Sequence, residues 1–285
     1  MQNQTQRSGS KLLRIAGAPL GVLFAHYSLI RQLTRRALAG RYRGSVLGIV
    51  WSILHPLALL AAYTFVFHIV LDARWQQLPL ERAANAGAVD FAVPLFSGLI
   101  LFWWAAECLQ LGPTIVQHHA NYVKKTIFPL PALPFPSFLV ASIHALISSG
   151  ILVIYLAVTG QLAATFWAYP LVLLALAPYL LGGMWLLGCL GVYLKDLSHL
   201  VNLVVMMLMF LTPIFYPISA VPEGCQTILH LNPLTFAVEQ ARAALIWGEG
   251  LRYGVLAQFF ALGWLIASAS YALFTHLQKD FADVL

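Results

Sequence analysis

The residues that could perform bond chemistry are few in this sequence, and they lack the spacing of known catalytic sites. The sequence contains no GxxxxGK[ST] phosphate loop, no HExxH zinc motif and no GxSxG nucleophile motif. His118 and His119 are adjacent, and neighbours on a helix point about 100° apart, so they cannot chelate one ion. We therefore predict no catalytic residue and no metal site in this chain.

The cysteines also argue against a metal site or a disulfide framework. The sequence has three of them, an odd number: Cys108, Cys189 and Cys225. Two fall inside apolar segments and none has CxxC spacing, so we interpret them as packing residues.

Glu107 is the one carboxylate placed well inside an apolar segment. Intramembrane carboxylates are costly and usually face a helix-bundle interior or a watery cavity. Two interpretations stay open. Glu107 either lines a path or pairs across a helix interface, or it is a structural residue that is protonated or reaches the membrane surface.

Aromatic residues dominate two apolar segments, at Trp51, Tyr63, Phe65 and Phe67 in the first and at 102–104 in the second. One interpretation is a membrane-interface belt with lipid-facing packing. The other is a conduit lined by ring faces, on which the C–H patches of sugars stack. We mark Trp51, Tyr63, Trp103, Trp104 and Glu107 as candidate channel-lining residues.

The composition places these residues in a membrane. Of 285 residues, 60% are hydrophobic and 9% are charged, with a mean hydropathy of +0.80, whereas a soluble domain carries roughly 25% charged residues. The net charge of +6 reflects orientation and contact with anionic lipids rather than nucleic acid. We predict an all-α integral membrane protein that spans the bilayer several times.

Six apolar segments are long enough to be candidate membrane spans. They are Val46–Leu71, Ala92–Val116, Phe135–Val158, Pro170–Tyr193, Leu200–Tyr216 and Tyr253–Thr275. The fifth is short and runs into TPIFYP, where two prolines spoil helix geometry. Together they predict a transmembrane domain over residues 44–275.

The distribution of basic residues predicts the orientation. Leu12–Ala25 resembles the apolar part of a signal peptide, but the arginines that follow resist translocation, so we predict that residues 1–27 stay as a cytoplasmic tail. Twelve of the 16 Lys and Arg residues then lie on the inner side, as the positive-inside rule requires. Residues 276–285 form a second cytoplasmic tail.

Residues 28–43 are too polar to span a membrane and predict an amphipathic helix lying in its inner interface. One side of this helix is apolar, and the arginines on the opposite side would contact lipid phosphates. Gly40, Gly44 and Gly48 permit a sharp turn into the first span and close helix packing. The candidate phosphate-contacting residues are Arg31, Arg35, Arg36, Arg41 and Arg43.

Two connections between spans look specialised. Residues 117–130 are basic and rich in proline, and a short helix there could pass a push from a soluble partner into two spans. Residues 217–250 contain two short apolar pieces that are too short to span, and the second opens with Asn232 as N-cap and Pro233 at the first helical position. We predict re-entrant or interfacial outer helices there.

Four stretches together resemble one family. They are RYRGSVLGIVWSILHPLALLAAYTFVF, ECLQLGPTIVQHHANYVKKTIFPLPALP, YLKDLSHLVNLVVMMLMFLTPIFYPISAVPE and LNPLTFAVEQARAALIWG. In this order they resemble the permease subunit of type-2 ATP-binding-cassette exporters, in the branch that exports O-antigen, capsule or teichoic-acid polymers. Lys195–Asp196 departs from the arginine–aspartate pair expected there.

The resemblance implies a homodimer in the bacterial inner membrane, served by two copies of a separate P-loop ATPase that binds ATP and Mg²⁺. It implies a lipid-linked polysaccharide as substrate and a lateral gate between spans one and five. The loop at 117–130 would seat on the ATPase, with Asn121, Tyr122, Lys124 and Lys125 as contact candidates. Pro222, Asn232 and Pro233 would belong to the re-entrant outer helices.

Three rival functions remain open. An exporter of a drug or small lipid would have the same fold with a more aliphatic channel. A membrane-embedded polyprenyl-sugar transferase needs clustered acids or histidines at the membrane face, whereas the outer acids here are scattered. A secondary transporter should carry more paired charges inside its spans than the lone Glu107.

Overall fold

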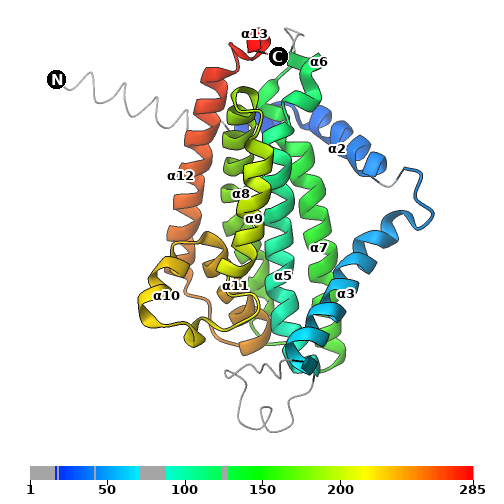
Figure 1. The fold of residues 1–285 in the computed structure, drawn as a ribbon, viewed down its shortest axis with the longest axis vertical. Coiled ribbons are helices and arrows are strands. Elements are labelled where there is room, and N and C mark those ends of the chain that lie inside the picture. The colour runs from blue at the N-terminus through cyan, green and yellow to red at the C-terminus, as the bar shows by residue number, and fades with distance from the viewer. Residues whose placement is uncertain (1–16, 18, 42, 71–87, 124–127, 285) are drawn as a thin grey trace, which may run out of the picture.

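The structure is a computed structural model that describes residues 17, 19–41, 43–70, 88–123 and 128–284. Helices and connecting turns make up these residues, and no strand occurs among them. Figure 1 shows long, roughly parallel helices, with α6 (Ala120–Val123) and α13 (Phe281–Val284) at one end and α10 (Glu223–His230) and α11 (Pro233–Arg242) at the other. We call these the α6 end and the α10 end.

Within the described residues, four helices are long and apolar enough to cross a membrane: Phe91–Thr114, Leu130–Val158, Phe166–Tyr193 and Tyr253–Leu277. They correspond to α5 (Ala88–Leu111), α7 (Pro134–Val158), α8 (Tyr169–Tyr193) and α12 (Tyr253–Leu277). Four of the six predicted spans are therefore confirmed as long apolar helices of a membrane protein. The predicted first and fifth spans form shorter helices, Trp51–Phe67 and Leu197–Leu211.

The first predicted span is broken near its start. Gly44 and Gly48 have positive φ angles of 84° and 52°, followed by a 3-10 turn at Gly48–Val50, α3 (Trp51–Thr64) and a π-helical stretch, η2 (Phe65–Val70). The predicted turn is confirmed at these two glycines, because positive φ is a conformation that glycine adopts without a Cβ penalty. Nothing lies within 4 Å of a Cβ built there, so within the protomer they serve the turn rather than close packing.

The fifth predicted span ends where its prolines begin. α9 (Leu197–Leu211) stops before Thr212 and Pro213, since proline lacks an N–H and cannot continue the hydrogen-bond ladder. At 1.5 Å per residue, its 15 residues reach only about 22 Å. The predicted break at TPIFYP is confirmed.

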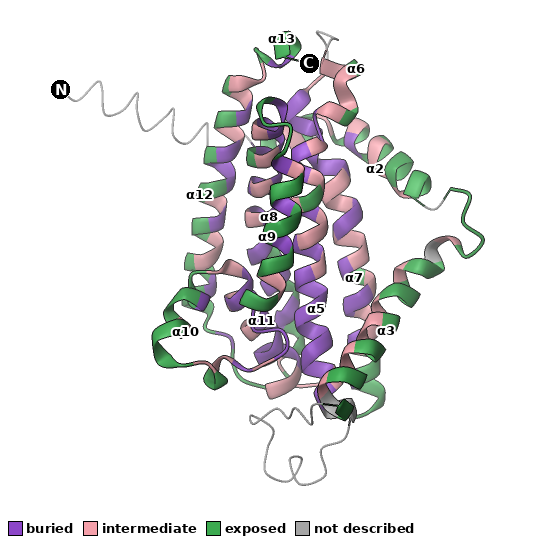
Figure 2. Cartoon of the chain, in the orientation of Figure 1, coloured by how far each residue is buried: buried purple, intermediate pink, exposed green. Residues whose placement is uncertain are grey.

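The core is built around α5, and α12 packs on α8 at its edge. In the most apolar 18-residue stretch of each span, 72% of the residues are buried for the span that includes α5, against 28% for α12. α5 is therefore central and α12 is peripheral (Figure 2). Glycines bring α8 and α12 close. A Cβ at Gly263 would lie 2.4 Å from the Tyr179 ring, and one at Gly182 would lie 2.8 Å from Ala267 Cα.

The predicted interface helix is confirmed as a helix, α2 (Tyr27–Arg41), and it packs against α7. Its apolar arc is partly covered, with Ile30 only 1% exposed, while Arg31, Arg35 and Arg36 are exposed. The apolar side of α2 is thus held by the bundle, which leaves its arginines outside.

Candidate functional site

A cavity of about 960 Å³ lies between α3, α5, α7 and α9. The chain runs towards the α10 end along α3 and α9 and away from it along α5 (Figure 1). Of the lining residues, Arg41 and Glu107 therefore lie at one end of the cavity, and Tyr63 and Met209 lie at its α10 end. All five predicted channel-lining residues touch it: Trp51, Tyr63, Trp103, Trp104 and Glu107. It is the candidate functional site.

The charged part of the cavity is a three-residue cluster. The Arg41 guanidinium donates to Glu107 Oε1, and His144 Nδ1 is hydrogen-bonded to Oε2 at 3.1 Å. The Glu107 and His144 side chains are 17% and 16% exposed, against 46% for Arg41. Of the two open interpretations of Glu107, the structure supports pairing across a helix interface in a cavity wall.

This cluster revises the role of one predicted residue. We predicted that Arg41, like Arg31, Arg35, Arg36 and Arg43, would contact lipid phosphate, but the Arg41 side chain instead turns to the carboxylate. An arginine near a membrane surface satisfies whichever anion is closest, and Glu107 offers a buried one. Sequence reasoning missed His144; its signal was a histidine inside an apolar span.

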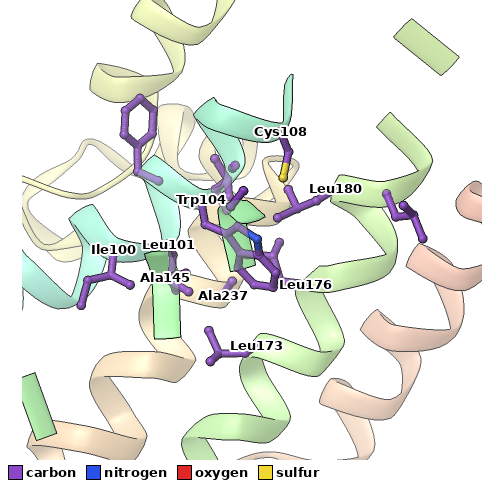
Figure 3. Close-up of a cluster of buried hydrophobic side chains, with 14 of the residues drawn as sticks. Ile100, Leu101, Trp104, Cys108, Ala145, Leu173, Leu176, Leu180 and Ala237 are labelled. Atoms are coloured by element: carbon purple, nitrogen blue, oxygen red, sulfur yellow. The ribbon is translucent and has the colours of Figure 1, made fainter. Parts of the chain in front are cut away.

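The two adjacent tryptophans face different surroundings. Trp104 is 5% exposed, its Nε1 donates to Ser142 Oγ at 3.1 Å, and Figure 3 shows its indole within the cluster that includes Leu176 and Leu180 of α8. Trp103 meets the His55 ring edge-on at 5.1 Å. Trp104 therefore contributes mainly to the core, whereas Trp103 belongs to the cavity wall beside His55.

An aromatic cluster stands at the α10 end of the cavity and consists of Tyr63, Phe67, Phe210 and Phe215. The Phe215 ring lies 5.2 Å from that of Tyr63, 4.7 Å from Phe67 and 6.1 Å from Phe210, between ring centroids. The Tyr63 hydroxyl also lies 3.9 Å from Met209 Sδ. The cluster joins α3 and η2 to the end of α9.

Arg242 is a buried cation that the sequence analysis counted only among external basic residues. It is 3% exposed, and its guanidinium donates to Pro94 O at 3.1 Å, Pro213 O at 2.7 Å and Ile214 O at 2.9 Å. Burial lowers the pKa of Arg242 to about 9, against the opposing charge of Glu239, so it keeps its charge at neutral pH. Its signal in the sequence was a cation at the start of the apolar run AALIW.

The predicted outer region contains two short helices. Pro222 precedes α10, and Asn232 caps α11, accepting a hydrogen bond from Leu234 N at 3.0 Å. Pro233 is the first residue of α11. The predicted cap is confirmed, and Asn232 Nδ2 additionally donates to Thr212 Oγ1 at 2.9 Å, which ties α11 to the segment after α9.

The described parts of the predicted coupling segment 117–130, which are residues 117–123 and 128–130, lie at the opposite end together with α6 (Figure 1). Asn121 is exposed, while Tyr122 stacks between Phe128 at 4.4 Å and His119 at 5.7 Å. Lys124 and Lys125 fall outside the described residues. Within the described ranges, no group of three His, Cys, Asp or Glu side chains is placed to hold a metal ion.

Comparison with known proteins identifies the family. An O-antigen export system permease protein RfbA of Klebsiella pneumoniae is 26% identical over 268 residues, covering 93% of this chain and 97% of the relative. The protein of the same name from Myxococcus xanthus is 23% identical over 266 residues, covering 92% and 96%. The family model for ABC-2 type transporters matches residues 28–246, and the chain therefore belongs to the ABC-2 type transporter family.

Proposed function

We propose that this chain is the permease subunit of an ATP-driven exporter that moves a lipid-linked polysaccharide outward across the bacterial inner membrane. In this proposal two copies of the chain form the path, and a separate ATPase supplies the energy. The relatives named O-antigen export system permease match almost the whole chain, which supports the same cargo class here.

The observation that carries the proposal is the wall of the cavity. Six aromatic residues line it, together with amide, hydroxyl and imidazole groups and a single ion pair. Ring faces and neutral polar groups bind sugars weakly and at many equivalent positions, so a polymer can advance without being trapped. A cavity for an aliphatic lipid alone would not need these polar groups.

The exposure of cavity residues supports a homodimer. His55 of α3 and Met206 of α9 line the cavity, yet both stay exposed in the single chain, Met206 at 66%. Apolar side chains beside them are exposed too, among them Leu54 and Leu203. A second copy placed against α3 and α9 would enclose the path, and the space between these two helices would then admit the lipid end of the substrate.

The proposed orientation puts the α6 end in the cytoplasm. The helices α13 and α6 lie at that end (Figure 1). The positive-inside rule also assigns the segments around both helices to the cytoplasmic side. α6 would then seat on the ATPase, since the sequence contains no P-loop of its own. α10 and α11 would form the re-entrant outer region.

The proposal is tested by supplying the chain with and without an ATPase. We expect a P-loop ATPase to be encoded beside this reading frame, amid glycosyltransferases. Cells lacking their own polysaccharide exporter would receive the permease alone, the ATPase alone, or both, and surface polysaccharide would be measured with a specific antibody. Only the pair should restore it.

Two outcomes would overturn the proposal. Transport or chemical conversion of the cargo by the permease without any ATPase would mean that the chain does not depend on a cytosolic motor. Efflux of a drug or a short lipid by the pair, with no polysaccharide reaching the surface, would establish the rival cargo class.

A further inference from the structure

The segment that follows α9 is irregular backbone between two elements of the bundle. Thr212, Pro213, Ile214 and Phe215 are all buried, and none of them lies in a helix. Buried carbonyls without partners cost several kcal/mol each in an apolar medium, on the order of 4–8 kcal/mol for transfer to hydrocarbon. This segment therefore needs hydrogen-bond donors from elsewhere.

Arg242 supplies those donors. Its planar guanidinium reaches Pro213 O and Ile214 O on the irregular segment and Pro94 O on α5, at 2.7, 2.9 and 3.1 Å. Gly98 makes room, since a Cβ there would lie 3.1 Å from Arg242 Nη2. One side chain thus joins α11, α5 and the segment after α9 through three different nitrogens. An ammonium has three donors on one nitrogen and does not reproduce this planar spread.

These hydrogen bonds also fix the position of the next residue, Phe215. Its backbone follows directly on the two carbonyls that Arg242 holds, and its ring is 7% exposed. The ring stacks on Phe67 at 4.7 Å and meets Tyr63 at 5.2 Å. Tyr63 lines the cavity, so Phe215 stands directly beyond its α10 end.

We infer that Phe215 closes the outer end of the transport path and that Arg242 is the residue that positions it. The inference rests on the proposed export function and adds the element that has to move. A polymer that leaves the cavity towards the α10 end must separate Phe215 from Tyr63 and Phe67. In the resting state Arg242 keeps the segment, and with it the ring, in place.

The first test measures leakage through the resting protein. The complete permease–ATPase complex is reconstituted without ATP into vesicles that contain calcein, a small polar dye. Phe215→Ala should release the dye several-fold faster than wild type, and so should Arg242→Lys, which keeps the charge but loses the planar fork. Phe166→Ala, which removes an exposed ring elsewhere, is the matched control and should not leak.

The double variant separates gating from loss of structure. Because both residues act on one closure, Phe215→Ala combined with Arg242→Lys should leak no faster than Phe215→Ala alone. The inference would be overturned if correctly assembled Phe215→Ala leaked no faster than wild type. It would also be overturned if the increase in leakage rate of the double variant equalled the sum of the increases of the two single variants.

A reversible cross-link between positions 63 and 215 tests the inference even if the variants above fail to fold. Tyr63→Cys and Phe215→Cys are introduced together with Cys225→Ser, which removes the exposed native thiol. A reducible bifunctional thiol reagent should join α3 to the segment and stop export, and reductant should restore export. The same reagent should not block export by the variant that carries Tyr63→Cys without Phe215→Cys. Full export by the cross-linked protein would refute the gate, whereas failure of the wild-type complex to export any polysaccharide would instead refute the proposed function.

Discussion

Arg41, the last residue of α2, donates a hydrogen bond to Glu107, which lies in the last turns of α5. The pair connects the interface helix, which leads into α3, to α5, which carries much of the cavity wall. His144 of α7 holds the other carboxylate oxygen at 3.1 Å. Three elements that surround the cavity are therefore joined at one carboxylate.

The first prediction concerns this ion pair. Arg41→Gln and Glu107→Gln should each destabilise the folded protein by about 1 kcal/mol, because each removes the ion pair while the half-exposed Arg41 remains partly solvated. The double variant should lose less than the sum of the two. Unfolding of the purified chain in detergent measures the three losses, and strictly additive values would show that the pair contributes no coupling.

The second prediction concerns Arg242. Arg242→Ala should reduce stability by about 3 kcal/mol or more, because three buried hydrogen bonds are lost together, although Pro94 O keeps its bond from Ser97 Oγ. The matched control is Arg252→Ala, since Arg252 is exposed and its removal should change stability by no more than about 0.5 kcal/mol. Equal unfolding midpoints for the two variants would contradict the bonding described here.

The third prediction separates the adjacent tryptophans. Trp104→Leu should destabilise the protein by about 2 kcal/mol, because it leaves a cavity in the core and removes the hydrogen bond to Ser142 Oγ. Trp103→Leu should slow export with little loss of stability, because its ring belongs to the cavity wall beside His55. The amount of folded protein and the surface polysaccharide are measured for both, and full export by Trp103→Leu would make it a packing residue.

The fourth prediction addresses the ATPase contact. Replacing Lys124 and Lys125 with Glu should abolish stimulation of the ATPase by the permease while membrane insertion stays intact, since these charges adjoin α6. Lys279→Glu, another lysine predicted on the inner side, is the control for charge reversal alone. Unchanged ATP hydrolysis in the double variant would argue against a coupling role for this loop.

The fifth prediction tests close packing between α8 and the 3-10 turn after α5. A Cβ at Gly191 would lie 1.9 Å from Pro113 O, so Gly191→Ala should destabilise by at least about 1–3 kcal/mol. Gly150→Ala in α7 meets nothing within 4 Å and should stabilise slightly, because alanine favours a helix over glycine by about 1 kcal/mol. Comparable thermal stability of the two variants would disprove the close approach.

Much of the fold could be predicted from the amino-acid sequence, because a bilayer permits few solutions. A long apolar segment must satisfy its own backbone and so forms a helix, which is why the four long helices were confirmed. Local chemistry also decided the Gly44–Gly48 turn, the end of α9 before Pro213 and the Asn232 cap. Each of these depends on residues within a few positions along the chain.

The directions of side chains could not be predicted in the same way. A helix that is apolar on all sides has no periodicity to distinguish protein from lipid, so Trp103 and Trp104 looked equivalent until packing separated them. Arg41 and Arg242 looked like surface cations for a related reason. Their partners lie on helices remote in sequence, and only the assembled bundle brings Glu107 to one and three backbone carbonyls to the other.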